Sequence, residues 1–328
     1  MTASRLARAA VAGAAVLALA CAAARGTTSK PRGELWAFTG PWDSLSNASV
    51  VANARRLDAA VTGWIALDTV TYQPVLLYPD PLGNGERPRR MALVTSWYRD
   101  RFHPATIRAL GADAARLAAT AGATARLAKS RGYRGLVLDF EAHEPADLSV
   151  LVAVARAFAD SARASGVGPV SMAIPATDTV GYPARPLLQS VDALVVMLYD
   201  QHWAGSEPGP IADRVWARTW LGVRVREAGA DRLVAGLPTY GYSWRTGKQG
   251  ETVGFGEARR AVQRAGTRLT RDETSGWLRG SAGGATVWVS DARVVARLAA
   301  DARALGVTRV ALWRLGLEDP ALWKALSR

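Results

Sequence analysis

Short apolar runs alternate with amphipathic stretches along most of this chain. Eight of the runs are typical of strands buried on both faces; they are Leu35–Phe38, Val61–Leu67, Met91–Ser96, Leu136–Phe140, Pro169–Pro175, Ala193–Tyr199, Leu233–Leu237 and Val310–Trp313. The stretches between them repeat apolar residues every three or four positions and predict helices; these are Ser46–Ala60, Ala105–Arg131 (with breaks at Gly111 and Gly122), Ala146–Ser165, Asp213–Ala228, Glu257–Ala265 and Asp291–Leu305. This order predicts an α/β fold, specifically a (β/α)8 TIM barrel.

One segment interrupts the alternation after the seventh predicted strand. Within it, Gly283-Gly284 separates Trp277-Leu278 from Val287–Val289, a pattern typical of a β-hairpin. We therefore expect a small β-rich insertion at about residues 242–290, inside a barrel domain that covers residues 34–328.

The first 33 residues have a different pattern and are expected to form a leader and a tether. Arg5 and Arg8 precede Ala9–Ala20, an apolar run that is too short to span a bilayer and fits a signal peptide. The run ends in Leu-Ala-Leu-Ala before Cys21, which resembles a bacterial lipoprotein cleavage site with Cys21 as the lipid-bearing residue. We expect an exported lipoprotein of the cell envelope. The alternative is ordinary secretion, to the periplasm or beyond, after cleavage near Ala20–Ala24.

Composition narrows the range of functions further. Cys21 is the only cysteine, and the three histidines lack metal-ligand spacing, so we expect no disulfide, metal or other cofactor. The formal net charge is +13, but most arginines are scattered along helix-like stretches instead of being clustered with aromatic residues. This distribution argues against nucleic-acid binding. Compositional bias with solvated helix faces explains the charge, and attraction to an anionic cell-envelope polymer is the alternative.

An acidic pair follows the fourth predicted strand. Leu136–Phe140 leads into Asp139 and Glu141, which are two positions apart. Because side chains alternate along a strand, both carboxyl groups point to the same side. Two neighbouring carboxyl groups do not ionise together easily, so one is expected to keep its proton at neutral pH and act as a general acid. A strand that ends in a solvated acidic loop is the alternative interpretation.

Aromatic and acidic residues also follow other predicted strands, at the end where barrel active sites lie. They are Trp42 after the first strand, Met197, Tyr199, Asp200, His202 and Trp203 around the end of the sixth, Tyr240 after the seventh and Trp313 at the eighth. Sugar faces stack on aromatic rings, while carboxyl groups bind hydroxyls and protonate a leaving oxygen. Any one of the 12 tryptophans more often belongs to a core, but several at strand ends favour a carbohydrate site.

Taken in order, these motifs resemble glycoside hydrolase family 18, the chitinase-like barrels. The last two acidic positions of the family's DxxDxDxE motif match Asp139 and Glu141. The family's Met-x-Tyr-Asp, Gly-x-Pro-x-Tyr-Gly and last-strand tryptophan motifs match Met197, Tyr199, Asp200, Gly236, Pro238, Tyr240, Gly241 and Trp313. Tyr199–Trp203 and Val287-Trp288 are similar to the cell-wall and spore-cortex lytic branch, and Trp313–Pro320 to modules attached to bacterial polysaccharide deacetylases. The resemblance covers nearly all of the chain after the tether.

The resemblance implies a substrate-assisted retaining mechanism, in which the substrate's own 2-acetamido oxygen attacks the anomeric carbon. Glu141 would be the general acid and then the base, and Asp139 would orient the acetamido group and stabilise the oxazolinium intermediate. Tyr199 would bind the acetamido oxygen, Trp313 would form the floor beneath the reacting sugar, and Asp200 would help to position that sugar. The remaining substrate-binding candidates are Met197, Tyr240, His202, Trp203 and Trp42.

The chain departs from the family pattern in two places. The first two Asp positions of the motif are Arg134 and Val137, so Asp139 is expected to lack the proton partner that the middle Asp supplies. The third strand lacks Ser-x-Gly-Gly, which favours N-acetylglucosamine polymers in general over chitin itself. His143 either tunes the proton affinity of Glu141 or is an exposed loop histidine, and His202 either lines the leaving-group side or packs within its loop.

Three hypotheses follow. The first is a monomeric glycosidase that cuts β-linked N-acetylglucosamine polymers such as peptidoglycan, chitin fragments or exopolysaccharide, with membrane contact only through a lipid anchor. The second is a non-hydrolytic carbohydrate-binding barrel of the cell envelope, which Val137 favours and the retained acidic pair disfavours. The third is an envelope scaffold, which gives no reason for an acidic pair beside strand-end aromatic residues.

Overall fold

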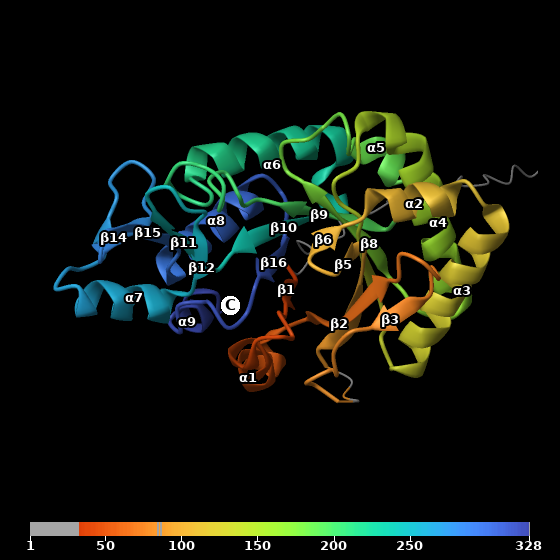
Figure 1. Ribbon diagram of the computed structural model, residues 1–328, viewed down its shortest axis with the longest axis horizontal. Coiled ribbons are helices and arrows are strands. Elements are labelled where there is room, and N and C mark those ends of the chain that lie inside the picture. Colours follow the sequence, from red (N-terminus) through yellow and green to blue (C-terminus); the bar gives the residue numbers. More distant parts are fainter. Residues whose placement is uncertain (1–32, 84, 86, 328) are drawn as a thin grey trace, which may run out of the picture. The chain divides into compact units, whose positions relative to one another are not determined.

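Eight parallel strands close into a barrel (Figure 1). The computed structural model describes residues 33–327 apart from 84 and 86. In order of pairing the strands are β1 (Leu35–Phe38), β16 (Arg309–Trp313), β10 (Leu233–Pro238), β9 (Ala193–Met197), β8 (Val170–Pro175), β7 (Leu136–Asp139), β4 (Arg89–Thr95) and β2 (Ala59–Leu67), which pairs with β1 again. The predicted (β/α)8 barrel is thereby confirmed.

Helices cover the outside of this barrel. They are α1 (Ser44–Asn53), α2 (Pro104–Gly111), α3 (Ala114–Ser130), α4 (Leu148–Ala164), α5 (Ala184–Leu187), α6 (Arg214–Ala228), α8 (Ala292–Ala304) and α9 (Leu322–Ala325). Four of them begin at an aspartate whose carboxylate accepts a backbone N–H of the first turn; these caps are Asp43, Asp113, Asp213 and Asp291. Aspartate at this position satisfies amides that have no partner within the helix.

Alternation along the strands separates two apolar layers. In β7, Leu136 and Leu138 pack outward in the cluster between strands and helices. Val137 points inward and joins the cluster that fills the barrel interior, with Trp36, Met91 and Leu93 among its members. Asp139 has the same parity as Val137, so it lies one layer higher, at the carboxyl end of the barrel.

The segment after β10 forms a separate five-stranded antiparallel sheet, which confirms the β-rich insertion. Its elements are β11 (Gly241–Arg245), β12 (Glu251–Val253), α7 (Phe255–Arg264), β13 (Thr270–Arg271), β14 (Leu278–Ala282) and β15 (Ala285–Val289). The β14–β15 hairpin turns at Gly283 and Gly284, whose φ angles of 56° and 80° favour glycine. In Figure 1 this sheet and α7 lie to the left of the barrel.

Two predicted helix features are wrong. The helix expected over Ser46–Ala60 ends at Asn53 and is followed by a 3₁₀ turn, η1 (Ala54–Arg56). Ala59 and Ala60 instead begin β2 and pair with β1, because cross-strand pairing overrides the helix propensity of alanine. The break expected at Gly122 is absent, since this glycine lies inside the continuous helix α3.

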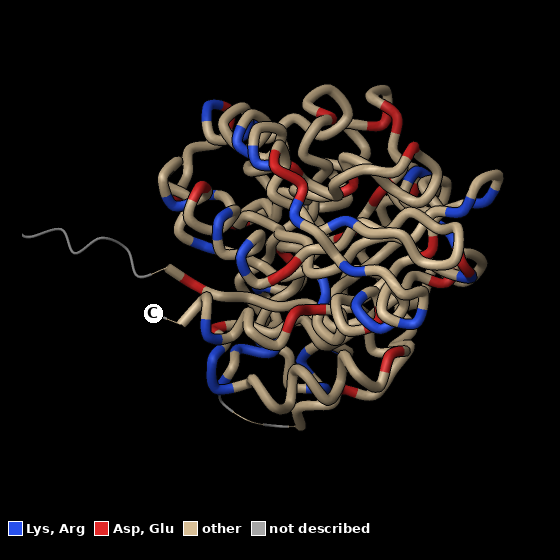
Figure 2. Tube along the Cα trace, turned by 90° about the vertical axis from the view of Figure 1, so that its left-hand side faces the viewer, with Lys and Arg blue, Asp and Glu red and all other residues tan. Residues whose placement is uncertain are grey.

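Smaller elements complete the rim of the barrel. They are β3 (Pro74–Leu76), which pairs with β2, the hairpin of β5 (Trp97–Tyr98) and β6 (Arg101–Phe102), and the 3₁₀ turns η2 (Pro145–Asp147) and η3 (Ala230–Arg232). Along the Cα trace, Lys and Arg positions are interspersed with Asp and Glu positions (Figure 2).

The predicted leader, including Cys21, lies outside the described residues. Within the described part of the chain, every helix falls short of the length and hydropathy that crossing a membrane requires.

Candidate active site

A cavity of about 660 Å³ opens among the residues at the carboxyl ends of the barrel strands. Its volume lies in the range of small-molecule sites. Seven of the residues predicted from the sequence line it: Trp42, Asp139, Glu141, Met197, Tyr199, Asp200 and Trp313. The structure therefore brings together side chains from β7, β9, β16 and the loop after β1.

The two acids of the β7 end lie deep in this cavity. Asp139 is buried, and its carboxylate accepts a hydrogen bond of 2.9 Å from the Thr95 hydroxyl at the end of β4. Glu141 is its ionisable neighbour, and each carboxyl group shifts the pKa of the other. Both acids line the cavity, as the shared parity of positions 139 and 141 predicts.

Burial determines how the acidic pair holds its protons. It raises the pKa of Asp139, although the hydrogen bonds from Glu141 and Thr95 oppose that rise. It raises the pKa of Glu141 well above the usual range, and the charges of Asp139 and Asp200 add to the effect. Glu141 therefore keeps a proton where an exposed glutamate loses it, which is the state that a general acid requires.

A tyrosine hydroxyl holds the backbone on both sides of Glu141. The Tyr182 hydroxyl donates to the Phe140 carbonyl (3.0 Å) and accepts from the His143 amide (3.2 Å). Between them, Ala142 has a φ of 61°, in the left-handed region that residues with a side chain rarely occupy. Tyr182 is itself buried, so it stabilises this turn and fixes the direction of Glu141.

Two tyrosine hydroxyls contact Asp200, the acid predicted to bind sugar at the end of β9. Asp200 also has a left-handed backbone, with a φ of 62°. Its carboxylate accepts a hydrogen bond of 2.5 Å from Tyr240, and Tyr242 lies within 3.5 Å. Burial raises the pKa of Asp200, and the two hydroxyls oppose that rise. Tyr199 stacks on Trp313 with the ring centroids 6.2 Å apart and an interplanar angle of 15°.

Aromatic rings continue from this stack to the surface. Trp64 lies 6.3 Å from Trp313 and 4.9 Å from Trp42, between ring centroids, and Tyr78 lies 6.2 Å from Trp42. Trp42 is 51% exposed, so part of its side chain is open to solvent at the mouth of the cavity. The series offers stacking surfaces for an extended chain of sugars.

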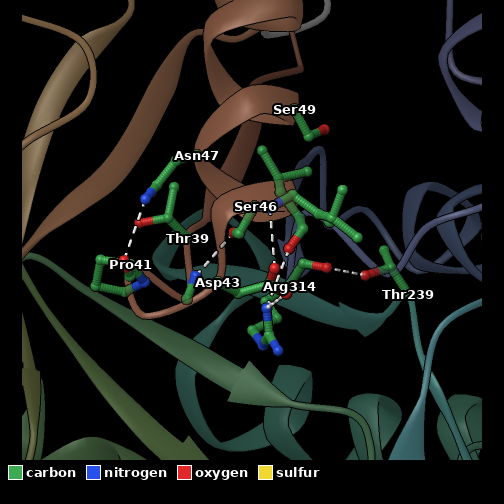
Figure 3. Close-up of polar contacts among 12 residues, drawn as sticks. Thr39, Pro41, Asp43, Ser46, Asn47, Ser49, Thr239 and Arg314 are labelled. Atoms are coloured by element: carbon green, nitrogen blue, oxygen red, sulfur yellow. Dashed lines mark hydrogen bonds and ion pairs between the residues drawn. The ribbon is translucent and has the colours of Figure 1, made fainter.

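A polar network attaches the loop of Trp42 to the strand of Trp313 (Figure 3). The Arg314 guanidinium donates to the Asp43 carboxylate (2.9 Å), and the Thr239 hydroxyl donates to the Arg314 carbonyl (2.5 Å). The same guanidinium lies 5.3 Å from the centre of the Trp42 ring. Arg314 therefore supports both predicted stacking residues, although neither its spacing nor its type indicated this from the sequence.

Three of the predicted substrate-binding residues do not line the cavity. Tyr240 does not reach the cavity itself, but its hydroxyl donates to Asp200, which lines the cavity. The His202 ring packs against Gly209, where a Cβ would come within 2.2 Å of it, and neither of its buried nitrogens has a hydrogen-bond partner. Trp203 is exposed on the adjoining loop. His143 is buried below the loop of Glu141, not exposed on its surface.

Sequence reasoning missed several residues that form the site. Trp64, Trp97, Phe102 and Trp216 line the cavity, and Thr95 and Tyr182 hold the acids. Their contacts join segments far apart in the chain. Among the described residues, no group of three or more His, Cys, Asp or Glu side chains is arranged to bind a metal ion.

Comparison with known proteins finds similar chains by sequence and by fold. No family model matches it. A sporulation-specific glycosylase of Bacillus subtilis, YdhD, is 29% identical over 213 residues, which cover 60% of this chain and 50% of the relative. This chain thus spans about half the length of that protein.

Two solved structures have the same fold. The spore cortex-lytic enzyme SleL of Bacillus cereus superposes with a TM-score of 0.79 and 18% identity, over 91% of this chain and 74% of its own. A chitinase of Chromobacterium violaceum superposes with a TM-score of 0.77 and 21% identity, over 90% of this chain and 98% of its own. At these identities the likeness concerns the fold alone.

Proposed function

We propose that this protein is a family 18 glycoside hydrolase that cleaves β-linked N-acetylglucosamine polymers. The observation that carries the proposal is the placement of Glu141 beside Asp139 in an open cavity with the Tyr199–Trp313 stack. The raised pKa of Glu141 supports it. The glycosylase name of the relative and the chitinase and cortex-lytic names of the matched structures support it.

The geometry suits a substrate-assisted retaining reaction. The reacting sugar lies on Trp313, and Glu141 protonates the leaving oxygen. The acetamido oxygen of the substrate attacks the anomeric carbon while Asp139 accepts the acetamido N–H and stabilises the positive charge. The Tyr199 hydroxyl, whose pKa is raised well above its usual range by burial and the neighbouring acids, stays protonated and donates to the acetamido oxygen. Glu141 then takes a proton from the incoming water.

Replacing the general acid tests the proposal. The full chain is incubated with chitin oligomers, poly-N-acetylglucosamine and peptidoglycan, and new reducing ends are identified by mass spectrometry. We expect cleavage of at least one polymer, and a loss of about 10²- to 10⁴-fold in Glu141→Gln. Glu257→Gln, on the exposed first turn of α7, is the matched control and keeps full activity. Full activity of Glu141→Gln contradicts the assignment.

A non-hydrolytic carbohydrate-binding protein is the second candidate. Val137 favours it, because the strand position below Asp139 is apolar and buried. Glycan binding by the wild-type chain without any cleavage over a long incubation would support this candidate and exclude the first.

We also propose that the protein is an exported lipoprotein of the cell envelope, attached through Cys21. The apolar run before this cysteine supports the proposal. Incorporation of labelled fatty acid into the wild-type protein, and its loss in Cys21→Ala, is the expected result. Release of an unlabelled wild-type protein would favour ordinary secretion.

A further inference from the structure

We propose that the Thr95 hydroxyl is the positioning group that holds the Asp139 carboxylate toward Glu141, in place of the proton partner that Val137 cannot supply. The inference rests on the proposed function, because it concerns the same acidic pair. Thr95 is a positioning residue, since it acts on substrate only through Asp139.

Strand pairing places the two residues side by side. In the parallel pair of β4 and β7, Thr95 is opposite Asp139, and Leu93 is opposite Val137 one layer below. Thr95 is fully buried and its hydroxyl lies 2.9 Å from the Asp139 carboxylate. Such a hydrogen bond to a charged acceptor is stronger than a neutral one.

The direction of the Thr95 proton is determined by a second contact. The Trp97 backbone N–H donates to the Thr95 hydroxyl oxygen at 2.9 Å. A hydroxyl has a single proton to donate, and the oxygen already accepts from Trp97, so the proton points to Asp139. Trp97 also lines the cavity, so the same contact connects the cavity wall to the acidic pair.

The strand positions directly below Thr95 and Asp139 are apolar. Leu93 and Val137 are buried members of the apolar barrel interior. A valine can neither accept the Asp139 proton nor donate to its carboxylate. The hydrogen bond from Thr95 is therefore the contact that positions the Asp139 carboxylate beside Glu141.

The other ionisable groups around Asp139 do not compensate for its charge. Glu141 follows it on the same strand end, Tyr199 interacts with it from the end of β9, and Tyr182 from the loop after β8. Asp200 acts on the neighbouring Glu141. All of these groups are acidic or neutral. The Thr95 bond favours the ionised form of Asp139, so its removal makes a second protonation of the pair easier.

The test compares three variants of the full chain. Thr95→Val keeps the shape of the side chain and removes the hydroxyl; Thr95→Ser keeps the hydroxyl; Thr124→Val is the matched control, since Thr124 is equally buried but bonds within helix α3. Turnover of an N-acetylglucosamine oligomer is measured from acidic to alkaline pH. In Thr95→Val we expect about a tenfold lower kcat, with the acidic limb of the pH profile moved up by about one pH unit. In Thr95→Ser we expect the acidic limb of the pH profile at its wild-type position. In Thr124→Val we expect the turnover and the pH profile of the wild type.

A purely structural role predicts a different result. Lower turnover of Thr95→Val with an unmoved acidic limb would overturn the proposal, as would unchanged turnover or a Thr95→Ser variant that behaves like Thr95→Val. Titration of ¹³C-labelled aspartate by NMR adds a readout that needs no catalysis. There, Thr95→Val raises the lower apparent pKa of the acidic pair, and an unchanged titration overturns the proposal. If the wild type cleaves no polymer but Thr95→Val still raises the lower apparent pKa of the acidic pair, the proposed function is refuted and the role of Thr95 stands.

Discussion

The acidic pair of β7 and Arg224 of α6 are both ionisable sites largely enclosed by protein, but Arg224 has the larger set of partners for its charge. Its guanidinium donates to four backbone carbonyls and one carboxylate, which belong to Pro175, Ala176, Asp178, Tyr182 and Glu227. Asp139 and Glu141 have Thr95 and each other. A buried charge with enough hydrogen-bond partners, such as that of Arg224, forms a fixed structural contact. An acid with few partners, such as Glu141, keeps its proton instead.

The two sites are also connected. The carbonyls that Arg224 binds lie at the last residue of β8, Pro175, and in the loop that follows, which includes Ala176 and Tyr182. Pro175 and Ala176 also line the cavity. Tyr182 in turn holds the backbone around Glu141. The satisfied charge therefore maintains the geometry that the reactive acids need.

The largest effect on stability is expected from removing the Arg224 guanidinium. Arg224→Met leaves several buried carbonyls without a donor and should lower the free energy of unfolding by about 3–5 kcal/mol. Arg226→Met, two residues along the same helix and exposed, should change it by less than about 0.5 kcal/mol. Chemical denaturation of both variants measures the difference. Equal stability of the two would show that the carbonyl contacts of Arg224 contribute little.

A smaller effect is expected from loosening the contact between the two sites. Tyr182→Phe removes both hydrogen bonds to the turn of Glu141, and kcat should fall about tenfold while KM stays unchanged. Tyr72→Phe, whose ring is stacked with Arg116 away from the cavity, should keep the wild-type kcat. Steady-state kinetics on an N-acetylglucosamine oligomer tests this. A change in KM alone would contradict a role in aiming Glu141.

The smallest effect is expected on the pH dependence of stability that Glu141 causes. The folded-state pKa of Glu141 is raised, so the folded protein binds its proton more tightly than the unfolded chain does. Stability from this group is therefore present below the unfolded pKa and is lost as pH rises through the folded pKa.

Glu141→Gln removes this titration. We expect the variant to be more stable than the wild type by on the order of 1 kcal/mol above neutral pH, with the difference disappearing in acid. Thermal unfolding as a function of pH measures it, with Glu257→Gln as the exposed control. A less stable Glu141→Gln at alkaline pH would mean that the carboxylate is stabilised by partners that the structure does not show.

Much of the fold and of the candidate site could be predicted from local patterns. The eight apolar runs predicted the barrel strands, and the spacing of Asp139 and Glu141 predicted that both enter the cavity. The predictions were wrong where contacts with distant segments of the chain determine the local structure. Ala59 belongs to a strand because β1 pairs with it, and His202 packs under Gly209 because the loop folds back.

The sequence by itself determined which segments form the barrel strands and which side of the barrel each acid faces. Both follow from neighbouring residues: the apolar runs mark the strands, and side chains alternate along each strand. Tertiary structure alone decided which groups surround the acids. Thr95, Tyr182 and Arg224 come from other strands, loops and helices, and their contacts cross 44, 42 and 48 residues of chain. No local periodicity carries such contacts, because they exist only after the barrel has closed.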